Sequence, residues 1–150
     1  MREKKCLNSL LFRCLRYDSK LIKLYRNTYI ITVCYNATTV IEATILSIIG
    51  QTYSNIEYII IDGGSTDGTI EVIKKYEKKI SYWVSEPDKG IYDAMNKGIV
   101  KSTGKWIHFL NAGDVYLNTH ILEDCIRCFN EKKVKADVLY GDVICKFDFG

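Results

Sequence analysis

The sequence predicts an α/β fold in which helices flank a mostly parallel β-sheet. Short apolar runs rich in β-branched residues alternate with longer segments whose apolar residues recur at helical spacing. Strands separated by helices of this length form right-handed βαβ units, which place the strands parallel. The run IEYIII at 56–61 is apolar at almost every position, as expected of a strand that is buried on both faces.

The individual elements follow from these patterns. Strands are expected at 29–36, 56–61, 80–85, 105–110 and 136–143. Helices are expected at 40–51, 69–79, 91–103 and 117–133. Residues 36–39 offer helix-start chemistry for the first helix, while Gly50 and Gly104 follow the first and third helices as terminators.

The chain divides into a basic leader, residues 1–28, and a body, residues 29–150. The leader holds eight Lys or Arg and two acids, a net charge of +6, whereas the body holds thirteen basic and sixteen acidic residues, a net charge of −3. Leucine and phenylalanine recur in the leader at loosely helical spacing, which predicts a helix. Two interpretations stay open: a solvated helix, or a basic amphipathic helix that lies on an anionic membrane surface.

Composition disfavours several locations and partners. The sequence contains no run of about 18 uncharged apolar residues, so it predicts no membrane-spanning helix. Arg13 and Arg16 interrupt the apolar stretch that a secretory signal would need. We therefore expect a cytoplasmic protein, peripheral at the inner face of the membrane if the leader binds lipid. The body has no basic stripe interleaved with aromatic residues, so no nucleic-acid partner is expected.

Polar loops follow four of the predicted strands. They begin at Tyr35, Asp62, Ser85 and Asn111. In parallel sheets, ligands bind beyond the carboxyl ends of the strands, so the sequence predicts a binding site at this edge. The loops match neither a Walker loop, nor a dinucleotide GxGxxG fingerprint, nor an EF-hand.

The loop after the second strand reads IDGGSTDGT. Asp62 stands at the strand tip, where its carboxylate can accept hydrogen bonds from a hydroxyl or from a base N–H. Gly63 and Gly64 permit a tight turn and the close approach of a ligand. Ser65 or Thr66 can cap the next helix, and Asp67 is expected only to satisfy turn and helix-start amides.

Two further clusters follow the third and fourth strands. In SEPDKGIYDAMNKG, Asp88 and Lys89 precede a helix that carries Asp93 and Asn96; the alternative is a plain surface turn with a solvated helix face. In FLNAGD, the strand delivers Asn111 and Asp114 to its tip. Their oxygen atoms suit magnesium or manganese, whereas His108, inside the strand, is expected to be packed.

Taken together, three segments resemble the family 2 glycosyltransferases with the GT-A fold, which is Rossmann-like. The segments are YNATTVIEATILSIIGQTYSNIEYIIIDGGSTDGT, SEPDKGIYDAMNKGIVKSTGKWIHFLNAGD and DVLYGD, in the right order and at the right spacing from Tyr29 to Val143. Among these enzymes, the likeness is closest to bacterial ones that build surface polysaccharides.

The resemblance implies transfer of a sugar from a nucleotide-diphosphate donor to a hydroxyl of a saccharide or lipid-linked acceptor, usually with inversion and with Mg²⁺ or Mn²⁺. It places Tyr35 and Asn36 near the base and Asp62 near the base or ribose. It assigns the remaining donor-binding positions to Asp88, Lys89, Asp93, Asn96 and Asn111, and the metal to Asp114.

The sequence departs from the commonest family pattern. Many members have two acids at the second strand tip, where this chain has Gly63 in the second place; many have Asp-x-Asp at the metal loop, where this chain reads Asn-Ala-Gly-Asp. The family uses a second half for the acceptor and the catalytic base, and the chain ends at KFDFG, so no catalytic residue is assigned. We expect a truncated or split transferase with an incomplete C-terminal half; the alternative is a non-catalytic nucleotide-sugar-binding or interaction module.

Overall fold

The computed structural model describes residues 12–14, 28–103, 106–131 and 138–139. The strands are β1 (Phe12–Cys14), β2 (Thr28–Cys34), β3 (Ile56–Asp62), β4 (Tyr82–Ser85), β5 (Trp106–Phe109) and β6 (Val138–Leu139). The helices are α1 (Ile41–Ile49), α2 (Thr69–Lys75), α3 (Ile91–Lys101) and α4 (Ile121–Glu131), and a 3₁₀ turn, η2 (Glu77–Lys79), follows α2.

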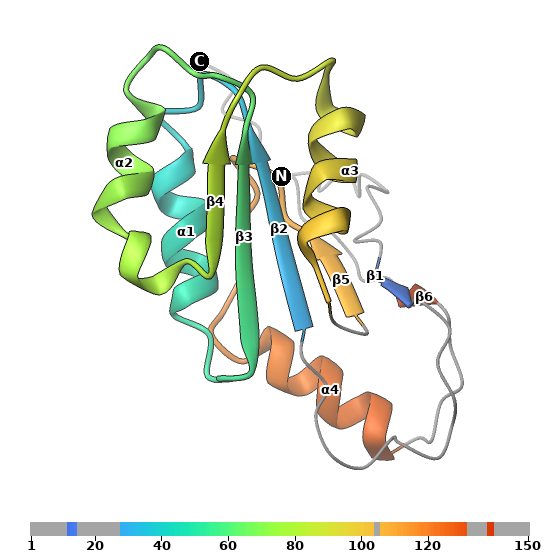
Figure 1. The fold of residues 1–150 in the computed structure, drawn as a ribbon. Helices are drawn as coiled ribbons and strands as arrows, with labels where there is room; N and C mark the ends of the chain where they lie inside the picture. Colours follow the sequence, from blue (N-terminus) through green and yellow to red (C-terminus); the bar gives the residue numbers. More distant parts are fainter. Residues whose placement is uncertain (1–11, 15–27, 104–105, 132–137, 140–150) are drawn as a thin grey trace, which may run out of the picture.

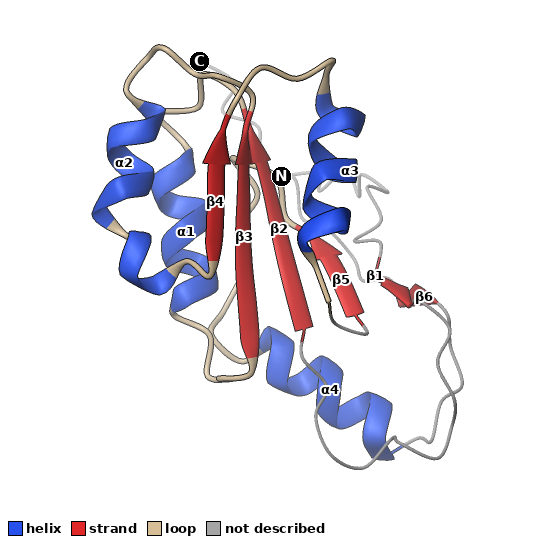
Figure 2. Ribbon diagram, in the orientation of Figure 1, coloured by secondary structure: helices blue, strands red, loops and turns tan. Residues whose placement is uncertain are grey.

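The strands form one sheet in the order β4-β3-β2-β5-β1-β6. The four strands β2 to β5 run parallel, whereas β1 pairs antiparallel with both β5 and β6. α1 and α2 cover one face of the sheet and α3 covers the other, while α4 lies at the end where the parallel strands begin (Figure 1). Figure 2 shows the same alternation of strands and helices, which confirms the predicted α/β class.

Two apolar layers hold the helices to the sheet. Alternate residues of β2 and β3 point to opposite faces, as period-2 geometry requires. Ile30 and Ile60 pack with Ile41 and Ile45 of α1, whereas Ile31 and Ile61 pack with Ala94 of α3. Every residue of β2 is buried, which explains its continuous apolar, β-branched composition.

Several element boundaries differ from the prediction. β2 begins one residue early because the Thr28 amide donates to the Asn55 carbonyl at 3.3 Å, extending the ladder. The helix predicted at 69–79 is broken at Tyr76, which adopts φ −111° and ψ 9° and donates its hydroxyl to Glu42 of α1 at 2.8 Å. α4 begins at Ile121 rather than 117 because Asn118 Oδ1 accepts the His120 amide at 2.8 Å in a local turn.

The helix starts also differ from the prediction. α1 begins after Val40 and α2 after Gly68, in each case without a side-chain cap, so neither Ser65 nor Thr66 serves as one. α3 ends at Lys101, before the predicted end at 103, and Gly104 lies outside the described residues.

The predicted leader helix is wrong where the structure describes the leader. Phe12–Cys14 is a strand whose partners in β5 are His108, Ile107 and Trp106. Pairing there satisfies backbone groups along the edge of β5, which a helix would leave unpaired. The rest of residues 1–27 lies outside the described residues.

Candidate active site

The loops named in the sequence meet at the carboxyl edge of the parallel strands. From β2 the chain reaches β3 through α1 on one face of the sheet, whereas β5, on the other side of β2, is reached through α3 on the opposite face. β2 is therefore the topological switch point, beside which open α/β sheets leave a crevice for ligands.

Asp62, at the tip of β3, organises its own loop. The carboxylate has no exposed surface. Oδ2 accepts the amides of Gly64 (3.1 Å) and Ser65 (2.8 Å) and the hydroxyl of Ser85 (2.6 Å). Oδ1 accepts the Ser65 hydroxyl and the Cys34 thiol. Burial by itself would raise the pKa of Asp62, but the bonds from Ser65, Ser85 and Cys34 outweigh it and lower the pKa.

This geometry changes how Asp62 can serve a nucleotide. A ligand would have to break existing hydrogen bonds to reach the carboxylate, so the arrangement favours a positioning role over direct contact with base or ribose. The same bonds tie the tip of β3 to β2 through Cys34 and to β4 through Ser85, and so fix three strand ends relative to one another.

A second set of bonds joins the β2 and β3 loops. Asn36, with a φ of 48°, accepts the Thr66 amide on Oδ1 at 3.0 Å, and its own amide donates to Ser65 Oγ at 2.7 Å. Asp67 accepts the Thr38 amide on Oδ2 and the Thr69 amide on Oδ1, both at 3.0 Å. These contacts agree with the prediction that Asp67 serves turn and helix-start amides. Asn36 therefore links the β2 loop to the β3 loop through these hydrogen bonds. The neighbouring Tyr35 is 65% exposed.

The loop between β4 and α3 brings Asp88 to the same edge. Asp88 Oδ1 accepts the Gly90 amide at 2.7 Å, and Asp93 Oδ2 accepts the Lys89 amide at 3.1 Å. The side chains of Lys89 and Asn96 are exposed. Asp93 is thus partly committed to holding the loop, whereas Lys89 and Asn96 remain open to a ligand.

Lys97 is a residue of this region that the sequence did not single out as a site. Its ammonium group contacts Glu86 at 2.9 Å, the Pro87 carbonyl at 3.0 Å and Asp93 at 3.7 Å. The hydrogen bond to Glu86 raises the pKa of Lys97. The i,i+4 spacing of Lys97 from Asp93 was the sequence feature that could have identified it. The contacts show that Lys97 holds the loop against α3.

The loop after β5 carries Asn111 and Asp114 over the end of β2. The Ala112 amide donates to the Val33 carbonyl at 3.2 Å, and the Gly113 amide donates to Thr44 Oγ1 of α1 at 3.0 Å. Asn111 Oδ1 is a buried acceptor without a hydrogen bond from the described residues. Asp114 is an exposed residue, yet partial desolvation of its carboxylate raises its pKa.

Comparison with known proteins assigns this arrangement to a family. The family model "Glycosyl transferase family 2" matches residues 29–143, which span β2 to β6 and all four strand-tip loops. The chain belongs to glycosyl transferase family 2.

Relatives of this family 2 chain include two mycobacterial proteins. An uncharacterized glycosyltransferase of Mycobacterium tuberculosis is 35% identical over 104 residues, which are 69% of this chain and 40% of the relative. A PGL/p-HBAD biosynthesis glycosyltransferase of Mycobacterium bovis is 33% identical over 120 residues, which are 78% of this chain and 46% of the relative. The chain therefore spans less than half the length of these relatives.

Solved structures share the fold. The mannosyltransferase PcManGT from Pyrobaculum calidifontis, in complex with GDP-Man and Mn²⁺, superposes with a TM-score of 0.64 at 21% identity, covering 71% of this chain and 33% of that one. Residues 1–349 of S. aureus TarS in complex with UDP-GlcNAc give a TM-score of 0.62 at 23% identity, covering 70% of this chain and 31% of that one. Both are glycosyltransferases of the GT-A type, as predicted for this fold.

The loop after β5 can supply part of the coordination shell of a divalent metal ion. Asn111 Oδ1, a buried acceptor without a partner in the described chain, and the desolvated Asp114 carboxylate are hard oxygen donors in one loop. No group of three or more His, Cys, Asp or Glu that could hold a metal occurs among the described residues. Such a set suits Mg²⁺ or Mn²⁺ when substrate phosphates supply further ligands.

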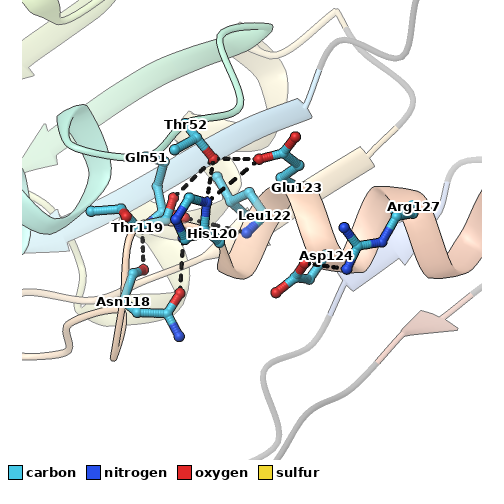
Figure 3. Close-up of polar contacts among 9 residues, drawn as sticks. All are labelled: Gln51, Thr52, Asn118, Thr119, His120, Leu122, Glu123, Asp124 and Arg127. Carbon is cyan, nitrogen blue, oxygen red and sulfur yellow. Dashed lines mark hydrogen bonds and ion pairs between the residues drawn. The ribbon is translucent and has the colours of Figure 1, made fainter.

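A polar cluster at the opposite end of the sheet has a structural role in this family 2 chain. Figure 3 shows the loop after α1 meeting the start of α4. The Thr52 hydroxyl donates to Glu123 at 2.7 Å, Gln51 Nε2 donates to the Asn118 carbonyl at 2.8 Å, and the Leu122 amide donates to Gln51 Oε1 at 3.2 Å. The bond from Thr52 lowers the pKa of Glu123. The sequence analysis did not foresee this cluster, which anchors α4 far from the strand-tip loops.

Proposed function

We propose that this chain binds a nucleotide-diphosphate sugar at the carboxyl edge of its sheet and serves an inverting glycosyltransferase of polysaccharide biosynthesis. The observation that carries the proposal is the meeting of four polar loops at the switch point beside β2, with Tyr35 exposed and with Asp88, Asn111 and Asp114 at the same edge. Membership of the family supports transfer as the reaction class.

The residues divide into positioning and contacting groups. Asp62, Asn36, Asp67 and Lys97 hold the loops in place through bonds within the protein. Tyr35, Asp88, Lys89, Asn96 and Asn111 are left to contact the donor. Asp114, with Asn111, would hold Mg²⁺ or Mn²⁺, which, when bound, neutralises the charge that develops on the departing diphosphate.

Location and acceptor are proposed in the same way. We infer a cytoplasmic protein whose acceptor is a saccharide or a lipid-linked sugar, with membrane-surface contact through the basic leader. Among the described helices, none has the length and apolar character needed to cross a membrane. Nucleic acid is not proposed as a partner.

A second candidate is a non-catalytic module that binds nucleotide sugars. It is favoured by the loop after β5, which offers a metal the single carboxylate of Asp114 where many family members carry two acids. Titration calorimetry with UDP- and GDP-sugars, with and without Mn²⁺, followed by an assay of donor hydrolysis and transfer, separates the candidates. Binding with turnover supports the transferase, binding without turnover supports the module, and no binding of any nucleotide sugar contradicts both.

The metal assignment has its own test. Asp114→Asn should abolish the Mn²⁺-dependent part of donor binding, because the amide removes the one carboxylate of the β5 loop. Asp124→Asn is the matched control, since Asp124 lies on α4 and pairs with Arg127 at 2.6 Å. Calorimetry with and without Mn²⁺ gives the readout. Unchanged Mn²⁺ dependence in Asp114→Asn would show that the metal ligand lies elsewhere.

A further inference from the structure

Three strand tips place Tyr35, Gly63 and Glu86 side by side. Cys34 is paired with Asp62 and Asp62 with Ser85, so the next residue of each strand stands at the same level of the edge. The ladder continues there, because the Gly63 amide donates to the Cys34 carbonyl at 2.9 Å and the Glu86 amide donates to the Asp62 carbonyl at 3.0 Å. Gly63 is the middle position of the three.

The Asp88 carboxylate occupies the space next to Gly63 where a side chain at this position would lie. A Cβ atom built on Gly63 would lie 2.6 Å from Asp88 Oδ2 and 3.4 Å from Tyr35 Cδ2. No side chain at position 63 fits unless the carboxylate moves. Glycine therefore leaves this space to a neighbouring acid and is not needed here for a positive φ, and the acid that the tip of β3 lacks at this position is supplied by the loop after β4.

Asp88 is held in place and keeps one oxygen available. Oδ1 accepts the Gly90 amide at 2.7 Å, which fixes the carboxylate. Oδ2, the oxygen nearest to Gly63, accepts no hydrogen bond from the described part of the chain. Asp62 is the opposite case, because both of its oxygens are already bonded and no part of it is exposed.

Tyr35 supplies an apolar surface next to this oxygen. Its ring edge and the Asp88 carboxylate approach the same point above Gly63, and the side chain is 65% exposed. An exposed aromatic ring beside an unpaired acceptor suits a planar heterocycle that carries an N–H. A glycine at the base of the site lets such a ring approach the backbone closely.

We propose that Asp88 reads the nucleobase of the donor, with Oδ2 accepting a ring N–H while the base lies against Tyr35; this rests on the proposed function. Uracil offers N3–H and guanine offers N1–H with its adjacent amino group. Adenine and cytosine present a ring nitrogen lone pair at the corresponding edge, which a carboxylate repels. The site therefore selects uridine or guanosine diphosphates over those of adenosine and cytidine.

The test measures the dissociation constants of UDP, GDP, ADP and CDP for the full 150-residue chain by calorimetry. The wild type should bind UDP or GDP roughly tenfold or more tightly than ADP and CDP, since a hydrogen bond to a charged group is worth about one decade or more. The UDP and GDP arms distinguish the two bases that carry the N–H. Asp88→Asn should lower the discrimination ratio about fivefold or more, because its amide can also donate to a ring nitrogen.

Gly63→Ala provides a second, independent variant, because its Cβ displaces the carboxylate and should lower the same ratio. Asp124→Asn is the control, since it removes an acid of α4 that pairs with Arg127 at 2.6 Å, far from the strand-tip loops, and it should leave the ratio unchanged. Equal binding of all four nucleotides by the wild type, or an unchanged ratio in both Asp88→Asn and Gly63→Ala, would overturn this inference alone. Failure of every nucleotide to bind would overturn the proposed function together with it.

Discussion

Two aspartates at one sheet edge differ in what their surroundings leave them free to do. Asp62 accepts bonds from Ser65, Ser85, Gly64 and Cys34. Asp88 has one oxygen bonded to the Gly90 amide and one that accepts no hydrogen bond from the described residues. Sequence position alone favoured Asp62 as a contact residue, because an acid at a parallel strand tip lies beside the expected crevice. The burial of Asp62 by the hydroxyls of its neighbours favours a positioning role instead, and such burial is not visible in a strand-tip pattern.

Asp62→Asn tests the positioning role. The amide nitrogen would face donors that now converge on a carboxylate, leaving buried polar groups unsatisfied at a cost of about 2–4 kcal/mol in the free energy of unfolding. Urea unfolding monitored by circular dichroism measures the change. Asp124→Asn, which breaks an exposed pair with Arg127, should cost less than about 1 kcal/mol. Equal effects of the two substitutions would contradict the assigned role of Asp62.

His108 makes the stability of the fold depend on pH. It is fully buried in β5, as the sequence predicted, and hydrogen-bonds Tyr116 through Nδ1. Burial lowers the pKa of His108 from 6.5 to about 3. Between these two pKa values the unfolded chain binds a proton that the folded chain does not. The contribution of His108 to stability is therefore fully present above the unfolded pKa, and it is lost progressively as the pH falls below that value.

The expected loss from His108 is about 2 kcal/mol in the free energy of unfolding between about pH 7.5 and about pH 5. Denaturant unfolding at a series of pH values measures it. His108→Gln should be less stable at neutral pH but should lose about 2 kcal/mol less over the same interval, because its amide does not titrate. Parallel pH profiles for the two proteins would show that His108 is not the titrating group.

At the scale of elements, the sequence predicted the types and the order of the helices and strands better than it predicted where each of them ends. Continuous apolar strands and helical spacing identified β2 to β5 and α1 to α4, because both signals come from burial on the sheet. The ends depended on contacts between distant residues, such as Tyr76 with Glu42 and Thr52 with Glu123. The strand at Phe12–Cys14 was missed because its pairing partner, β5, lies some ninety residues away and leaves no local pattern.

The packing of α3 on the sheet depends on Gly98. A Cβ at this position would lie 2.6 Å from Ile31 Cγ2 on the buried strand β2. Alanine favours a helix over glycine by about 1 kcal/mol, but overpacking a core costs about 1–3 kcal/mol. Gly98→Ala should therefore lower the free energy of unfolding by up to about 2 kcal/mol, the overpacking cost less the gain in helix propensity. Because α3 carries Asp93 and Asn96, the affinity for the donor should also fall in Gly98→Ala.

A double-mutant cycle isolates this contact. In an Ile31→Ala background the space beside Gly98 is open, so Gly98→Ala should become neutral or stabilising by up to about 1 kcal/mol. Urea unfolding of the wild type, the two single variants and the double variant measures the coupling. Additive effects would mean that Gly98 and Ile31 do not restrict the approach of α3.

At the scale of the whole molecule, charge is divided between the two parts of the chain. The leader carries a net +6 and the body a net −3, an arrangement that favours contact of one end with an anionic surface. Deleting residues 1–27 would be a poor test, because Phe12–Cys14 belongs to the sheet and its loss would expose the edge of β5. Charge neutralisation that leaves this strand intact avoids the problem.

Replacing Lys4, Lys5, Lys20 and Lys23 with glutamine should weaken binding to vesicles that contain anionic lipid. Each lysine near such a surface contributes about 1 kcal/mol, so the combined loss in affinity should exceed about tenfold at low salt and shrink as salt is raised. Co-sedimentation with anionic and with neutral vesicles measures it. The matched control replaces Lys74, Lys75, Lys78 and Lys79, which lie in α2 and η2 of the body and remove the same charge. Equal losses in the two variants would attribute binding to net charge, and unchanged binding in the leader variant would contradict the membrane-surface proposal.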